Sequence, residues 1–138
     1  RLSLVGSEMC IRDRIGVAFQ LQDDLLDVYG DPEVFGKKIG GDILCNKKTY
    51  MLIKALDRAD AKQREELNRW LDAETCQPAE KIKAVTELYN QLDIRSVCEN
   101  KMRGYYTLAM ESLAAVGVAE ERKKELKNLV KLLMYREM

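Results

Sequence analysis

The hydrophobic residues of this chain recur at the spacing of α-helices along nearly its whole length. In the first clear segment, residues 15–29, the apolar positions are Phe19, Leu21, Leu25, Leu26 and Val28. The same spacing predicts further helices over residues 47–60, around 67–71, over 78–92 and 94–116, and from 120 onward. No segment shows the strict alternation of apolar and polar residues that is typical of a strand. We therefore predict an all-α fold.

A glycine-rich loop separates the first two predicted helices. Gly30 and the turn-prone Asp31 and Pro32 end the first helix, and the loop continues to about residue 46. A loop of this length is unusual in a compact domain without a functional reason. A glycine-rich backbone approaches phosphate oxygens closely and offers N–H donors, although any sharply turning loop also needs glycine.

Acidic residues gather at the end of the first helix and just after it, at Asp23, Asp24, Asp27, Asp31 and Glu33. Asp23 and Asp27 stand four residues apart, so a helix places both carboxylates on one face. Like charges at that spacing repel each other, and no basic residue follows Arg14 on this helix. We therefore expect a cation between these carboxylates.

Lysines follow the acidic cluster at Lys37, Lys38, Lys47 and Lys48, with only Asp42 against them. Carboxylates suit a hard divalent cation, and Mg²⁺ is usually held by one or two of them together with substrate phosphates. A diphosphate bridged to the aspartates by Mg²⁺ would engage both charge clusters. The alternative interpretation is that the aspartates and lysines pair with each other across the loop as solvated surface charges.

The order of these residues resembles that of a known family. F-Q-x-x-D-D-x-x-D, followed by G-K, G-D and N-K-x-T, is similar to the second aspartate-rich region of the trans-isoprenyl diphosphate synthases, which include farnesyl and geranylgeranyl diphosphate synthases. The resemblance is specific from about Ile15 to Leu56. The residues that carry it are Gly16, Phe19, Gln20, Asp23, Asp24, Asp27, Gly30, Asp31, Gly36, Lys37, Gly40, Asp42, Lys47 and Thr49.

The resemblance implies both a fold and a reaction. The fold is the C-terminal part of an isoprenoid-synthase helical bundle. The reaction is the Mg²⁺-dependent condensation of an allylic diphosphate with isopentenyl diphosphate, in isoprenoid biosynthesis. Charge develops on the diphosphate as its C–O bond breaks, so the catalytic groups should be cations directed at it. Asp23 is then expected to ligate Mg²⁺ directly, with Asp24 and Asp27 orienting metal-bound waters or neighbouring groups.

The resemblance also distinguishes among the lysines. Lys37 and Lys47 match the lysines that grip the diphosphate in this family. Lys38 and Lys48 do not match them, and we interpret both as solvated. Lys37 and Lys47 are therefore expected to bind the substrate and to act in catalysis.

Two residues of the first helix complete the site that the resemblance implies. Gln20 lies where the family places a side chain near the allylic carbocation, and Phe19 would line the pocket or pack beside it. Both are expected to contact substrate, and Gln20 is also assigned to catalysis. The resemblance further implies a homodimer in the full-length protein.

Composition narrows the class of protein. Lys+Arg and Asp+Glu number 23 each in the 138 residues, so net charge does not favour a nucleic acid or a membrane surface as partner. No apolar run approaches the ~20 residues needed to span a bilayer. Histidine is absent, which excludes a His-based general base or a His-ligated metal within this chain.

The cysteines lack the spacing of a metal or redox site. They are interpreted as free thiols in a reducing cytoplasm, and a packing role is expected for Cys98. The full set is Cys10, Cys45, Cys76 and Cys98.

Residues 1–14 differ from the rest of the chain. They begin without Met, show no clean helical period and resemble translated sequencing-adapter read-through. We interpret this segment as non-native and residues 15–138 as the C-terminal portion of an all-α polyprenyl synthase domain. A signal peptide fits poorly because the apolar residues are too interrupted. At the other end, Arg136 is the one residue of the tail suited to contact diphosphate, and a solvated helix end is the favoured interpretation there.

Several parts of the resembled family are missing from this chain, which we therefore interpret as an incomplete fragment. Its first aspartate-rich motif and its isopentenyl-diphosphate-binding basic residues are absent, and the product length is undefined. Two other classes stay open. One is a non-catalytic all-α subunit of a heteromeric prenyl synthase, and the other is a class I terpene cyclase. The retained aspartates and lysines argue against the first, and the D-D-x-x-D pattern argues against the second.

Overall fold

The computed structural model describes residues 2–117 and 120–134, and it contains no strand within those ranges. The predicted all-α fold is confirmed. The C-terminal residues 135–138, which include Arg136, lie outside the described part of the chain.

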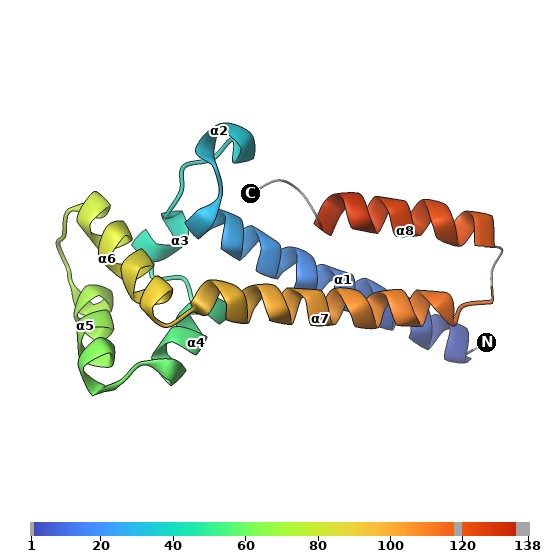
Figure 1. Cartoon of the computed structure of the whole chain (residues 1–138), viewed down its shortest axis with the longest axis horizontal. Helices are drawn as coiled ribbons and strands as arrows, with labels where there is room; N and C mark the ends of the chain where they lie inside the picture. Colours follow the sequence, from blue (N-terminus) through green and yellow to red (C-terminus); the bar gives the residue numbers. More distant parts are fainter. Residues whose placement is uncertain (1, 118–119, 135–138) are drawn as a thin grey trace. The chain divides into compact units, whose positions relative to one another are not determined.

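The chain divides into two compact units. One unit combines the residues up to Asp23 with those from Glu99 onward, and the other is Asp24–Cys98. Two helices, α1 (Leu2–Tyr29) and α7 (Ile94–Ala114), contribute residues to both units (Figure 1).

The unit Asp24–Cys98 is built around α6. Its complete helices are α2 (Pro32–Phe35), α3 (Gly41–Leu44), α4 (Tyr50–Arg58), α5 (Ala61–Asp72) and α6 (Pro78–Gln91). Helix α6 packs against α3, α4 and α5 (Figure 1). Its apolar face is fully buried at Val85, Leu88 and Tyr89, which is the face that its 3.6-residue period of apolar positions predicts.

Capping side chains explain where these helices begin. The Thr49 hydroxyl accepts a hydrogen bond from the N–H of Leu52 (3.1 Å), so α4 starts at Tyr50 and not at residue 47 as expected. Asp60 and Gln63 form a reciprocal capping box at the start of α5.

The other unit contains the first part of α1, most of α7 and α8 (Glu120–Met134). Ile11 of α1 packs with Leu113 of α7 and with Val116, just after α7, in a small apolar cluster. Nearby, the guanidinium of Arg14 donates to the hydroxyl of Ser112 (2.8 Å), which adds a polar contact between α1 and α7.

Two further segments differ from the sequence expectation. Helix α1 begins at Leu2 instead of near residue 15, because residues 2–14 contain no proline and a single glycine and so offer little to stop a helix. The expected loop over residues 30–46 contains two four-residue helices, α2 and α3, which are too short to produce a periodic pattern. The interpretation of residues 1–14 as non-native stays a prediction.

Candidate functional site

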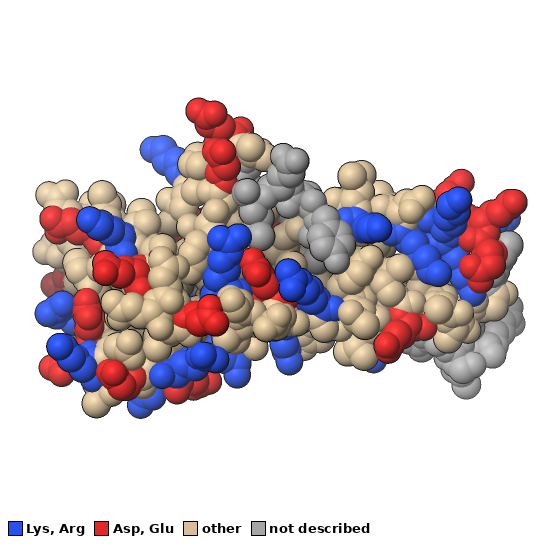
Figure 2. Space-filling model, in the orientation of Figure 1, with Lys and Arg blue, Asp and Glu red and all other residues tan. Residues whose placement is uncertain are grey.

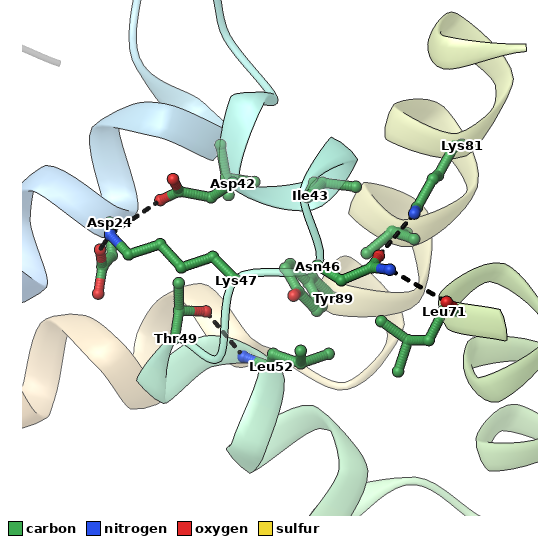
Figure 3. A pocket seen from close by; sticks show the side chains of 12 residues that line it. Asp24, Asp42, Ile43, Asn46, Lys47, Thr49, Leu52, Leu71, Lys81 and Tyr89 are labelled. Carbon is green, nitrogen blue, oxygen red and sulfur yellow. Dashed lines mark hydrogen bonds and ion pairs between the residues drawn. The ribbon is translucent and has the colours of Figure 1, made fainter. Parts of the chain in front are cut away.

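Lys47 lies between two carboxylates that are far from it in sequence. Its Nζ is 3.3 Å from Asp24 Oδ1, on the last turns of α1, and 3.7 Å from Asp42 Oδ2, on α3 (Figure 3). The backbone N–H of Lys47 donates to the carbonyl of Asp42 (3.0 Å), which fixes the start of this side chain beside α3. The structure therefore joins the acidic cluster of α1 to the lysine-bearing segment before α4.

Asp27 connects the same two segments through the backbone. Its Oδ2 accepts the N–H of Asp42 (2.9 Å), and its carbonyl accepts the N–H of Gly40 (2.7 Å). The carboxylate thereby satisfies one of the N–H groups that the first turn of α3 leaves without a helical partner. Asp27 thus holds the glycine-rich segment against the end of α1.

The two side chains of the Asp24–Lys47 ion pair differ in their exposure to solvent. The side chain of Asp24 is 7% exposed and that of Lys47 is 46% exposed. A buried carboxylate needs a nearby cation to offset its desolvation, and Lys47 supplies one. Burial by itself lowers the pKa of Lys47, but the attraction of Asp24 and Asp42 outweighs it and raises that pKa above its ordinary value.

An exposed asparagine, held by a buried lysine, supports the turn that precedes Lys47. Asn46 adopts a left-handed conformation (φ 55°), and its Nδ2 donates to the carbonyl of Leu71 (3.0 Å). Its Oδ1 accepts a hydrogen bond from Nζ of Lys81 (2.6 Å), a side chain that extends from α6 (Figure 3). The turn is therefore tied to both α5 and α6.

These residues line one narrow pocket of the Asp24–Cys98 unit. Its polar wall includes Asp24, Asp42, Asn46, Lys47 and Lys81, and apolar residues close the rest. The space left between the side chains admits about one water molecule. A larger anion is therefore excluded from this pocket and has to bind along the exposed part of the Lys47 side chain.

The remaining predicted site residues lie on α1 and in the loop that follows it. Phe19 and Asp23 are half-buried and Gln20 is exposed, and all three belong to the unit that combines the first part of α1 with the residues from Glu99 onward. Asp23 and Asp27 occupy successive turns of this continuous helix. Lys37, which is predicted to bind the substrate, is exposed. Lys38 and Lys48 are also exposed, as expected for solvated side chains.

The donor chemistry at the end of α1 fits Mg²⁺ bound together with a diphosphate. The described residues contain no group of three or more side chains already arranged as metal ligands. Mg²⁺ does not require one, since it commonly takes one or two protein carboxylates and completes its shell with phosphate oxygens and water. Asp23 offers such a carboxylate, whereas one oxygen of Asp24 is held by Lys47 and one oxygen of Asp27 by the backbone of α3.

Sequence reasoning missed the roles of Asn46 and Lys81. The signal for Lys81 was its register, because it occupies the apolar face of α6 one turn before Val85 and two turns before Leu88. A lysine at such a position is buried on folding and needs a polar partner. Asn46 gave a weaker signal, since asparagine is among the few residues that tolerate a positive φ.

Surface charge marks no further candidate site on the one face of α4, α5 and α6 that Figure 2 shows. On the face shown in Figure 2, acidic and basic side chains are interspersed over α4, α5 and α6. No helix within the described residues is both long enough and apolar enough to cross a membrane.

Comparison with protein families relates more than half of the chain to a known family. A family model described as polyprenyl synthetase matches residues 9–90. Among curated proteins, the short chain isoprenyl diphosphate synthase of Methanothermobacter thermautotrophicus is 55% identical over 53 residues, covering 38% of this chain and 16% of that protein. The farnesyl pyrophosphate synthase of Rattus norvegicus is 42% identical over 83 residues, covering 60% of this chain and 22% of that protein.

Solved structures agree with these relatives. A geranylgeranyl pyrophosphate synthase matches with a TM-score of 0.83 at 32% identity, covering 96% of this chain and 42% of that chain. A geranylgeranyl pyrophosphate synthase from Corynebacterium glutamicum, complexed with isoprenyl diphosphate and magnesium, matches with a TM-score of 0.84 at 28% identity, covering 96% and 38% respectively. The chain spans less than half the length of each of these proteins.

Proposed function

Because this chain belongs to the polyprenyl synthetase family, we propose that it forms part of a prenyltransferase that condenses an allylic diphosphate with isopentenyl diphosphate. The observation that carries the proposal is the group formed by Asp24, Lys47 and Asp42, in which the ammonium of a partly exposed lysine lies 3.3 Å and 3.7 Å from two carboxylates. Such a group presents both a cation for phosphate oxygens and oxygen ligands for a divalent metal.

The lysines act on the diphosphate in this proposal. When the C–O bond of the allylic substrate breaks, negative charge accumulates on the departing diphosphate, and a fixed ammonium lowers the energy of that transition state. The ion pairs of Lys47 with Asp24 and Asp42 support this role, because they orient its ammonium without a bound substrate. Lys37, exposed in the loop after α2, contributes a second cation.

The aspartates hold the metal, with Asp23 as a direct ligand and Asp24 and Asp27 supporting its water shell. Mg²⁺, when bound with the diphosphate, supplies positive charge to the leaving group. Gln20 and Phe19, one helical turn before Asp24 and Asp23, face the allylic group. The isopentenyl double bond then attacks the allylic carbon, and loss of a proton completes the new prenyl chain.

A direct assay tests this proposal. The full-length protein that contains this chain is incubated with an allylic diphosphate, radiolabelled isopentenyl diphosphate and Mg²⁺, and the extracted prenyl product is counted. We expect incorporation that disappears when EDTA removes Mg²⁺. Absence of incorporation in the intact protein would support the alternative of a non-catalytic subunit. A cyclised hydrocarbon formed without isopentenyl diphosphate would support a terpene cyclase.

Two further proposals rest on the family and not on the geometry of the site. We propose that the full-length protein is a homodimer and that it acts in the cytoplasm. Cys45, Cys76 and Cys98 are not joined in disulfides, which is compatible with a reducing compartment. Light scattering coupled to gel filtration measures the oligomeric state, and fractionation of cells measures the location.

A further inference from the structure

Lys81 is a cation buried in the body of the Asp24–Cys98 unit. Its relative exposure is 3%, and no ion pair of the described residues includes it. Its Nζ instead donates a hydrogen bond of 2.6 Å to Oδ1 of Asn46. Burial of an ammonium without a carboxylate lowers the stability of the folded state. If this position served only for packing, an apolar residue would stabilise the helix more.

The partner of Lys81 holds an unusual backbone conformation. Asn46 has a φ of 55°, and both ends of its amide are engaged, Oδ1 by Lys81 and Nδ2 by the carbonyl of Leu71 (3.0 Å). A left-handed residue persists where its surroundings over-determine it. The two hydrogen bonds therefore clamp this turn between α5 and α6.

Lys47 is the residue directly after the clamp. The amide of Asn46 points toward Lys81 and Leu71, while the side chain of Lys47 extends the other way, toward Asp24 and Asp42 (Figure 3). A lysine side chain is long and flexible, so the direction in which it leaves the backbone determines where its ammonium can reach. The clamp on Asn46 fixes that direction.

We propose that Lys81, acting through Asn46, is a positioning residue that places the ammonium of Lys47 for binding of a diphosphate. The inference rests on the function proposed above only in assigning the diphosphate to Lys47. Groups that bind a reacting anion lose much of their effect when displaced by about 1 Å, and support from neighbouring side chains is what prevents that displacement.

The test is a double-mutant cycle on anion binding. Binding of inorganic pyrophosphate with Mg²⁺ to the full-length protein is measured by isothermal titration calorimetry for Lys81→Met, Lys47→Met and the double variant. We expect each single variant to weaken binding by about tenfold or more, and the double variant to bind within about twofold of Lys47→Met. Lys83→Met, at an exposed position of the same helix, is the control and should bind as the unaltered protein does.

A merely structural role for Lys81 predicts a different result. In that case the fold losses of pyrophosphate affinity in the two single variants multiply in the double variant, because Lys81 then acts independently of Lys47. Since Lys81→Met could unfold α6, Asn46→Gly is measured as well, because glycine accepts the positive φ and removes the clamp without changing the helix. Unaltered binding in Asn46→Gly, or multiplied losses in the cycle, would overturn the inference.

The same measurements separate this inference from the proposed function. Prenyl transfer by the unaltered protein is assayed independently. If transfer is absent but the cycle shows coupling between Lys81 and Lys47, the proposed function fails and the positioning role stands. If transfer is present and the cycle shows no coupling, the reverse holds.

Discussion

At the scale of single residues, Lys47 links the two interpretations that the charge pattern allowed. One was a metal and diphosphate site, and the other was pairing of aspartates with lysines across the loop. Lys47 does pair with Asp24 and Asp42, yet its side chain remains 46% exposed and lines a pocket. Because the carboxylate of Asp24 is buried, Lys47 offsets its desolvation, and the exposed part of the same lysine can also meet an anion.

The first prediction compares Lys47 with its neighbour. Lys47→Ala in the full-length protein should lower kcat/KM for prenyl transfer by more than tenfold, because an electrostatic contact to the departing diphosphate is lost, whereas Lys48→Ala should change it by less than about twofold. Steady-state kinetics of both variants at saturating Mg²⁺ measures the difference. A larger loss in Lys48→Ala would contradict the assignment of the diphosphate to Lys47.

The second prediction separates two aspartates of α1. Asp23→Ala should lower turnover by more than tenfold, equivalent to about 1.4 kcal/mol of transition-state stabilisation or more. Asp27→Ala should cost less turnover but about 1 kcal/mol of unfolding free energy, because its carboxylate accepts the N–H of Asp42. Kinetics and urea denaturation are measured on both, and Asp27→Asn, which keeps an acceptor oxygen, should recover most of the stability. Equal turnover in Asp23→Ala and the unaltered protein would exclude Asp23 as a metal ligand.

The third prediction concerns Tyr89. Burial, with smaller contributions from Tyr29 and Asp42 that exceed the opposing hydrogen bond of Thr49, raises the pKa of its phenol well above its ordinary value. The folded state therefore holds this proton more tightly than the unfolded chain does. The resulting stability is complete below pH of about 10, where the free phenol titrates, and is lost as pH rises further.

Tyr89→Phe should therefore reduce the alkaline loss of stability. Above pH of about 10, the unaltered protein should lose up to about 1.4 kcal/mol per pH unit more than the variant does. Urea denaturation from pH 8 to 11 measures it, with Tyr50→Phe, at a half-buried site, as the control. Parallel stability curves for Tyr89→Phe and the unaltered protein would show that Tyr89 does not carry this dependence.

At the scale of helices, the period of apolar residues was sufficient to predict most of the fold. Helix α6 begins at Pro78, as the pattern predicted, because proline suits the first turn. The short helices α2 and α3 were not predicted, since four residues do not establish a period and their conformation depends on caps such as Asp31. Likewise, the partners of Asn46 and Lys81 come from different helices, and no local pattern connects them.

The fourth prediction tests the tight approach of α3 and α6. Gly40 has a φ of 91°, and a Cβ there would lie 2.6 Å from Cδ1 of Ile82, whereas Gly36 has a φ of 73° and open space around it. Gly36→Ala should cost about 1–2 kcal/mol of unfolding free energy through backbone strain alone. Gly40→Ala should cost more, because overpacking adds about 1–3 kcal/mol where the neighbour cannot move.

Urea denaturation of the two glycine variants measures that difference. Ile82→Ala in the Gly40→Ala background removes the atoms that a new Cβ would meet, so the double variant should be more stable than the sum of the two single effects. Equal losses in Gly36→Ala and Gly40→Ala would mean that the Ile82 side chain moves aside freely.

At the scale of the whole molecule, the difference in length between this chain and its relatives determines which activity we expect of the chain alone. It spans 16% of the Methanothermobacter synthase and 22% of the rat synthase. Its acidic cluster supplies one set of carboxylates, and a diphosphate held by metal ions from one side only remains open to water. Several apolar side chains of α8 are also exposed, at Leu126, Leu129 and Leu132.

The fifth prediction follows for the 138-residue chain expressed by itself. We expect no incorporation of radiolabelled isopentenyl diphosphate with Mg²⁺ and any allylic diphosphate, although far-ultraviolet circular dichroism should be strongly helical. The exposed apolar side chains of α8 should bind a hydrophobic dye, and the thermal transition should be broad, because helices whose apolar faces lack partners melt without cooperativity. A farnesyl pyrophosphate synthase of full length, assayed in parallel, is the positive control. Product from the isolated chain, or a sharp melt of a monomer that binds no dye, would show that these helices form a complete catalytic unit without further polypeptide.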